Sequence, residues 1–264
     1  MRIKSIAVVL AIVFVAVSIP VIHCHAGKKK TEDTADLHYR LGEEYFRNGD
    51  YLSALRELLK SVELEKKNPE AQYLLGTTYF HLGRYQDAER HLKIAIELKK
   101  GDREGYPEAH NNLGNVYLQT GRYDEAIAEF EKCLDVIFYQ PNFPRVYYNI
   151  GVAYMKKEDT AKAMENFKQA VKMDPSFCPA YLNMGDLLAK EKKHQEAIIE
   201  YQKILDYCPS TPIAGKARLL LGIELNEIGE KGRACEEFFA VIKELPNSEL
   251  AIKAAEYIRL LQCQ

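Results

Sequence analysis

The sequence predicts an all-α fold, a solenoid of six stacked helix pairs that a C-terminal helix closes. A glycine recurs at separations of 34, 38, 37, 34 and 37 residues, at Gly42, Gly76, Gly114, Gly151, Gly185 and Gly222. An alanine follows each glycine by twelve residues, at Ala54, Ala88, Ala126, Ala163, Ala197 and Ala234. Apolar residues keep helical spacing around both. A fixed period of this length is typical of stacked supersecondary units.

The first helix of each repeat contains the glycine, which we number position 8. Positions 4, 7, 8 and 11 share one helix face, and position 11 is large, namely Tyr45, Tyr79, Tyr117, Tyr154, Leu188 and Leu225. A glycine inside a helix costs up to about 1 kcal/mol relative to alanine. Six such glycines in register therefore predict close helix packing that offsets this cost.

The second helix of each repeat has its apolar face at positions 20, 24 and 27. Position 24 is again large, namely Leu58, Leu92, Phe130, Phe167, Tyr201 and Phe238. The turn between the two helices contains Gly49, Gly83 or Gly121 in the first three repeats, and glycine suits a left-handed helix end. We expect the small residues to let the two backbones approach, with the large residues filling the space on either side.

This pattern resembles the tetratricopeptide repeat (TPR) family over residues 35–246. The resemblance implies a right-handed superhelix, with another protein as the partner in its concave groove. Its six repeats would be residues 35–68, 69–106, 107–143, 144–177, 178–214 and 215–247. The family's proline at position 32 is present as Pro175, Pro209 and Pro246. A capping helix is expected over residues 248–264, with Ser248 as its N-cap, because the end of a solenoid must be covered.

The N-terminal residues 1–26 are predicted to be a signal peptide or membrane anchor, followed by a linker over residues 27–34. Arg2 and Lys4 precede a 17-residue apolar run from Ile6 to Ile22. Three fates are open: lipidation of Cys24, because "VIHC" resembles a bacterial lipoprotein box; cleavage after Ala26; and retention as an anchor. We expect export and a periplasmic-side, membrane-associated location. The alternative is an anchored domain on the cytoplasmic side of the inner membrane.

Four cysteines lie near predicted helix ends. Cys178 starts the first helix of the fifth repeat and Cys208 ends its second helix, so antiparallel packing brings them together. Cys235 begins the last second helix and Cys263 ends the capping helix. In an oxidising compartment these two pairs are candidate disulfides, provided that their Cα atoms lie within about 7 Å.

No motif for catalysis, phosphate binding or metal binding is present. The chain lacks a Gly-rich phosphate loop, an HExxH zinc motif and a nucleophile elbow. The histidines His38, His81, His91, His110 and His194 are interpreted as occupying different repeat positions, and the formal net charge of −2 gives no footprint for nucleic acid. We therefore predict a noncatalytic protein without cofactor, metal or nucleic-acid partner.

Asparagines recur where the resemblance places the concave groove. Position 6 is Asn112, Asn149 and Asn183 in three successive repeats, and Asn111 and Asn115 flank the first. An amide both donates and accepts hydrogen bonds, so such a ladder suits the main chain of an extended peptide. Similar ladders occur in the TPR superhelices of O-GlcNAc transferases. The alternative is that these are polar surface residues without a role.

The first two repeats differ at the inner positions 5 and 12, which are Tyr39, Phe46, Tyr73 and Phe80. This aromatic end suits apolar anchor residues of a partner, and partial burial against neighbouring repeats is the alternative.

Three functions compete. The first is an exported scaffold that assists assembly of an envelope complex, since the layout resembles the pilotin lipoproteins of type IV pili. The second is a cytoplasm-facing adaptor or chaperone-type protein. The third is an enzyme accessory or glycan-handling subunit, which the sequence leaves open.

Overall fold

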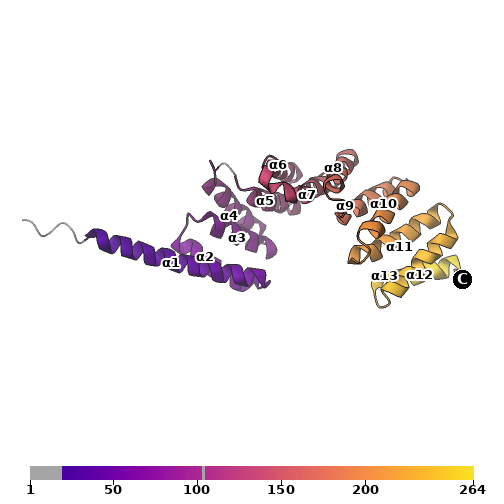
Figure 1. Ribbon diagram of the computed structural model, residues 1–264, viewed down its shortest axis with the longest axis horizontal. Helices are drawn as coiled ribbons and strands as arrows, with labels where there is room; N and C mark the ends of the chain where they lie inside the picture. The colour runs from indigo at the N-terminus through magenta and orange to yellow at the C-terminus, as the bar shows by residue number, and fades with distance from the viewer. Residues whose placement is uncertain (1–19, 103–104) are drawn as a thin grey trace, which may run out of the picture. The chain divides into compact units, whose positions relative to one another are not determined.

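The computed structural model describes residues 20–102 and 105–264. These residues form thirteen α-helices, one short 3-10 helix and no strand (Figure 1). The all-α fold of paired helices predicted from the glycine period is thereby confirmed. The chain divides into two compact units, the first ending at Asp102 and the second beginning at Arg103.

The first unit contains two helix pairs, α1 (Pro20–Arg47) with α2 (Tyr51–Leu64) and α3 (Pro69–His81) with α4 (Tyr85–Leu98). Within it α1 packs on α2, α2 on α3 and α3 on α4. Residues 27–34, which we expected to form a linker, continue the helix α1. The stretch from Lys28 to Asp36 contains neither proline nor glycine, so no residue in it breaks a helix.

The second unit holds the remaining four pairs and the last helix. Its elements are α5 (Pro107–Gln119), α6 (Tyr123–Leu134), η1 (Ile137–Asn142), α7 (Phe143–Lys156), α8 (Thr160–Met173), α9 (Cys178–Lys190), α10 (His194–Tyr207), α11 (Pro212–Glu227), α12 (Lys231–Glu244) and α13 (Glu249–Leu261). Successive helices pack on each other, and α13 covers α12 and also contacts α11. Ser248 caps α13, because its side-chain oxygen accepts a hydrogen bond from the backbone N–H of Ala251 at 3.1 Å.

Each mid-helix glycine lies directly under the position-24 side chain of its own repeat. A Cβ on Gly114 would lie 2.6 Å from the ring of Phe130, and a Cβ on Gly151 would lie 2.6 Å from the ring of Phe167. The position-20 alanines are fully buried at the same crossings. We expected the large residue at position 24 to lie beside the helix crossing. Instead, its side chain packs directly against the glycine at position 8, in the space that a Cβ on that glycine would occupy.

The turn inside every repeat places position 15 in the left-handed backbone region. Glycine provides this conformation in four repeats, at Gly49, Gly83, Gly121 and Gly229. In the fourth and fifth repeats the same position is Glu158, with φ 63°, and Lys192, with φ 60°. Non-glycine residues adopt this region at a cost, so these two turns are strained relative to the other four.

Within residues 20–102 and 105–264 no helix combines the length and the apolar character needed to cross a membrane. Most of the predicted leader, residues 1–19, lies outside the described residues, and so does the side chain of Cys24.

Candidate functional site

Four of the predicted groove asparagines form one cluster, which joins α5 to α7. Asn149 on α7 donates its side-chain N–H groups to the Oδ1 atoms of Asn111 and Asn115, each at 3.4 Å. Asn111 donates in turn to Oδ1 of Asn112 at 3.5 Å. All four side chains are half-buried. This asparagine cluster therefore connects the third repeat to the fourth through side-chain amides.

These amide contacts are longer than the usual 2.9–3.0 Å of a protein hydrogen bond, so each contributes weakly. The sequence interpretation assumed that asparagine at position 6 has no role in packing. The contacts of Asn149 with Asn111 and Asn115 show that it does have one, because they join neighbouring repeats. Among the described residues, the side-chain oxygen of Asn149 accepts no hydrogen bond. The cluster thus keeps hydrogen-bonding capacity for a ligand in addition to its role in packing.

The third position-6 amide stands apart from the cluster. Asn183 on α9 donates to the hydroxyl of Tyr148 at 3.3 Å. The ring of Tyr148 lies 5.3 Å from that of Phe177 and 5.7 Å from that of Phe167, between ring centroids. Asn183 is therefore held by an aromatic neighbour on the preceding first helix, α7.

Position 6 of the last repeat is Leu220, which lines a hollow of about 570 Å³ between α11 and α13. We call it the C-terminal hollow. Its apolar wall is Leu219, Leu220, Ile223, Leu250 and Tyr257, and its polar residues are Lys216, Lys253 and Glu256. The sequence reasoning missed this site, although apolar residues at positions 5, 6 and 9 of the sixth repeat were a readable signal.

Two residues of the predicted aromatic end, Phe46 and Phe80, meet around one histidine. Phe46 on α1 and Phe80 on α3 both contact the imidazole of His81, with ring centroids 5.4 and 5.7 Å apart. Tyr51 stacks on the same imidazole at 4.6 Å. Tyr39 and Tyr73 are half-buried. Burial raises the pKa of Tyr39 and lowers the pKa of His81.

A polar pair between positions 4 and 23 joins the two helices of four repeats, and the sequence reasoning missed it. The distances between the paired atoms range from 2.6 to 2.9 Å, and the pairs are His38–Glu57, Gln72–His91, His110–Glu129 and Arg218–Glu237. The prediction that histidines occupy different repeat positions was wrong, because His38 and His110 are equivalent and His91 occupies the partner position. These histidines hold helix pairs together.

Both cysteine pairs expected from helix-end proximity are joined in the structure. The disulfide between Cys178 and Cys208 links the two ends of the fifth repeat, with a Cα–Cα distance of 6.6 Å. The disulfide between Cys235 and Cys263 links α12 to the residues after α13, with a Cα–Cα distance of 5.7 Å. Cys133 is free and buried, and burial raises the pKa of its thiol to about 12. In the described part of the chain, no group of three or more potential metal ligands is present.

Models of the tetratricopeptide repeat family match residues 68–137, 144–177 and 179–211. A model described as anaphase-promoting complex, cyclosome, subunit 3 matches residues 23–95. The paired helices and their glycine register define a solenoid scaffold that binds other proteins. Within that class, the chain belongs to the tetratricopeptide repeat family.

Among known proteins, small glutamine-rich tetratricopeptide repeat-containing protein 2 of Mycosarcoma maydis is 32% identical over 91 residues, which are 34% of this chain. The chain spans about a quarter of the length of the first curated relatives that it matches.

Several solved structures are similar over most of the chain, among them PilW and PilF. PilW, a widely conserved type IV pilus biogenesis factor, matches with a TM-score of 0.71 at 21% identity, over 84% of this chain and 98% of PilW. Pseudomonas aeruginosa PilF matches with a TM-score of 0.66 at 20% identity, over 88% of this chain and 98% of that chain. At these identities, the likeness establishes the fold.

Proposed function

We propose that this protein is a noncatalytic scaffold that binds an extended segment of another protein along the first helices of its second unit. The observation that carries the proposal is the sequence of side chains at position 6. Amides at Asn112, Asn149 and Asn183 are followed by Leu220 in the C-terminal hollow. A polar row that ends in an apolar hollow suits a segment held by its main chain and anchored by one apolar side chain.

The amides recognise the main chain because each peptide unit of an extended segment presents one donor and one acceptor. The contacts that Asn149 makes within the protein are 3.4 Å long, so a shorter hydrogen bond to a ligand replaces them at little cost. Binding through the main chain does not discriminate between most side chains of the segment. Selectivity then depends on the anchor residue.

The C-terminal hollow supplies that anchor site. Leu220 and Ile223 on α11 are half-buried and face Leu250 and Tyr257 across the hollow. Its volume of about 570 Å³ exceeds that of one large side chain, so a leucine, phenylalanine or methionine of the segment enters it. Apolar anchors of this kind account for much of the affinity at protein interfaces.

We propose an exported, membrane-tethered location for this scaffold, on the periplasmic side. The two disulfides support export, because such bonds persist in oxidising compartments and are rare in the cytosol. The basic start and apolar run of residues 1–26 supply the targeting signal and tether. The likeness to the pilus factors PilW and PilF favours assistance in assembling an envelope complex. A cytoplasm-facing adaptor is the second candidate, and the disulfides count against it.

Site-specific photocrosslinking tests the proposed groove in cells. A photoreactive amino acid at Leu220 should label the partner, whereas the same amino acid at the exposed Glu236 on α12 should not. Equal labelling from both positions would place the interface elsewhere on the solenoid. Protease accessibility in intact and lysed spheroplasts tests the location separately, and protection by the inner membrane would overturn the exported assignment.

A further inference from the structure

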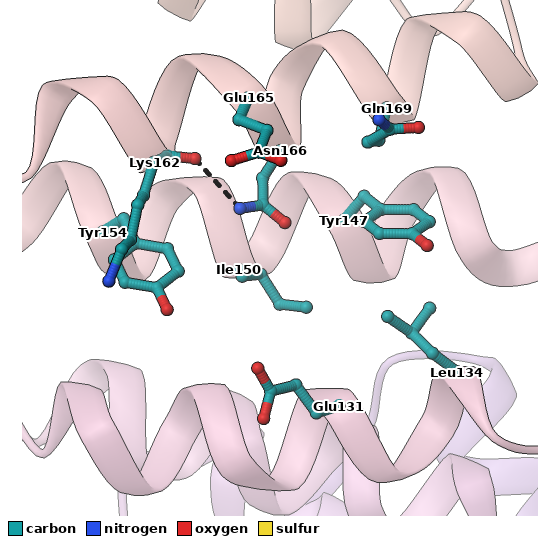
Figure 2. Close-up of a pocket in the computed structure, with 9 residues that line it drawn as sticks. All are labelled: Glu131, Leu134, Tyr147, Ile150, Tyr154, Lys162, Glu165, Asn166 and Gln169. Atoms are coloured by element: carbon teal, nitrogen blue, oxygen red, sulfur yellow. Dashed lines mark hydrogen bonds between the residues drawn. The ribbon is translucent and has the colours of Figure 1, made fainter.

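A second hollow, of about 500 Å³, opens between α6, α7 and α8 (Figure 2). We call it the tyrosine hollow. Figure 2 shows Tyr147 and Tyr154 on either side of Ile150 along α7, with Glu131 of α6 facing Ile150 and with Glu165 and Asn166 of α8 above it. Lys162, Leu134 and Gln169 complete the lining. We propose that the tyrosine hollow binds an arginine side chain of a partner protein.

The hollow lies on a different side of α7 from the asparagine cluster. Tyr147, Ile150 and Tyr154 are spaced by three and four residues and share one helix face. Asn149 is turned away from Ile150 by roughly 100°, the rotation between consecutive helical residues. An arginine bound in this hollow therefore leaves the proposed peptide groove open, and the two sites can be tested independently.

The hollow opens where the fourth repeat lacks the polar pair that joins positions 4 and 23 in four of the other repeats. In the first, third and sixth repeats a basic or imidazole side chain at position 4 meets a glutamate at position 23. In the fourth repeat these positions are Tyr147 and Asn166. Asn166 donates its side-chain N–H to the backbone oxygen of Lys162 at 2.9 Å instead of reaching α7.

Two arginines of this protein show how a guanidinium binds beside a tyrosine ring and a carboxylate. The guanidinium of Arg122 lies 4.1 Å from the ring centroid of Tyr117 and donates to a carboxylate oxygen of Glu125 at 2.6 Å. Arg84 repeats the arrangement, 4.6 Å above Tyr79 and 2.9 Å from the carboxylate of Asp87. A guanidinium that lies on a tyrosine ring and pairs with a carboxylate is thus a recurring arrangement in this fold.

The fourth repeat has the tyrosine and the carboxylates of this arrangement but lacks the arginine. Position 16, which is arginine in the second and third repeats, is here Asp159. The ammonium group of Lys162 lies 5.1 Å from the ring centroid of Tyr154. Among the described residues, neither Glu131 nor Glu165 takes part in an ion pair. Carboxylates on two helices, with aromatic and apolar walls between them, match the charge and the planar shape of a guanidinium.

Nuclear magnetic resonance titration of the full-length, tyrosine-labelled protein tests this proposal. The probe is acetyl-arginine-amide, and its neutral isostere acetyl-citrulline-amide is the control ligand. We expect the Tyr147 and Tyr154 ring signals to shift with arginine, with at least tenfold weaker binding of citrulline. The double variant E131Q/E165Q should lose the response, whereas the matched variant E196Q/E236Q, which removes two exposed carboxylates on α10 and α12, should keep it.

Equal binding of citrulline would overturn the proposal, as would an unchanged response in E131Q/E165Q. Preferential binding of acetyl-leucine-amide would assign the hollow to an apolar side chain instead. Failure of this experiment leaves the photocrosslinking from Leu220 unaffected, because the two experiments address different faces of the unit.

Discussion

Cys235, near the start of α12, is bonded to Cys263, which lies two residues beyond the end of α13. The bond therefore fixes the last helix to the repeat that it covers. Without α13, the apolar wall of α11 at Leu219 and Leu220 would meet water. The disulfide thus protects the end of the solenoid and one wall of the C-terminal hollow.

Replacing Cys235 and Cys263 with serine should lower the free energy of unfolding. The two cysteines lie 28 residues apart, and the entropy of closing such a loop in the unfolded chain corresponds to about 3–4 kcal/mol. Urea unfolding measures the loss, and hydrogen exchange should show faster exchange in α13. The double variant at Cys178 and Cys208 is the control, because it should leave exchange in α13 unchanged. Slow exchange in α13 of C235S/C263S would contradict the assigned role.

Gly151→Ala should destabilise the protein, because its methyl group would collide with the ring of Phe167. Overpacking of a core typically costs about 1–3 kcal/mol, which exceeds the gain of up to about 1 kcal/mol in helix propensity. Gly232→Ala on α12 is the matched control, since nothing lies within 4 Å of its new methyl group. This control should be neutral or slightly more stable in thermal unfolding. A gain in stability for both variants would mean that close packing does not explain the glycines.

Glu158→Gly and Lys192→Gly should each stabilise the protein by about 1 kcal/mol. Both residues have positive φ in turns where the other four repeats use glycine. Gly83→Ala, which places a side chain in the equivalent conformation, should have the opposite effect. Chemical denaturation of the three variants decides the question, and a loss of stability in both glycine variants would show that the side chains of Glu158 and Lys192 matter more than the backbone strain.

Stability should fall as the pH drops below about 6.5, in part through His91. Burial lowers the pKa of His91 below its ordinary value, and the neighbouring Arg90 lowers it further. The unfolded chain therefore binds a proton at a pH where the folded protein does not, so acid favours unfolding. His91→Gln retains an amide that can meet Gln72, and it should flatten the decline in urea midpoint between pH 7 and pH 5. An unchanged pH profile would remove His91 from the explanation.

Replacing Asn112, Asn149 and Asn183 with alanine should weaken binding of the crosslinked partner by roughly ten- to a thousandfold. This range follows from about 0.5–1.5 kcal/mol for each hydrogen bond, allowing for non-additivity. Because the internal contacts of Asn149 and Asn183 are 3.3–3.4 Å long, we expect little change in thermal stability. Gln195→Ala, at an exposed position of α10, serves as the control. A folded triple variant with full affinity would refute the role of these amides in binding.

The periodic features of the sequence predicted the helix pairs because glycine, alanine and large apolar residues are all set by packing inside one repeat. Contacts between repeats were harder to predict, since they depend on how far neighbouring repeats rotate against each other. This is why the bond from Asn149 to Asn111 was missed. The tyrosine hollow was missed for a related reason: it arises where a polar pair is absent, and an absent pair is visible only after the other pairs are known.

The pairs at positions 4 and 23 also restrict which amino-acid substitutions the chain can accept. The first repeat joins its helices with imidazole and carboxylate, the second with amide and imidazole, and the sixth with guanidinium and carboxylate. A single substitution, such as Arg218→Glu, would place two negative charges next to each other at positions 4 and 23, because Glu237 is the partner of Arg218. Neighbouring repeats can therefore diverge most easily by compensated, two-site substitutions. Covariation between these positions would record the history of each repeat better than either position alone.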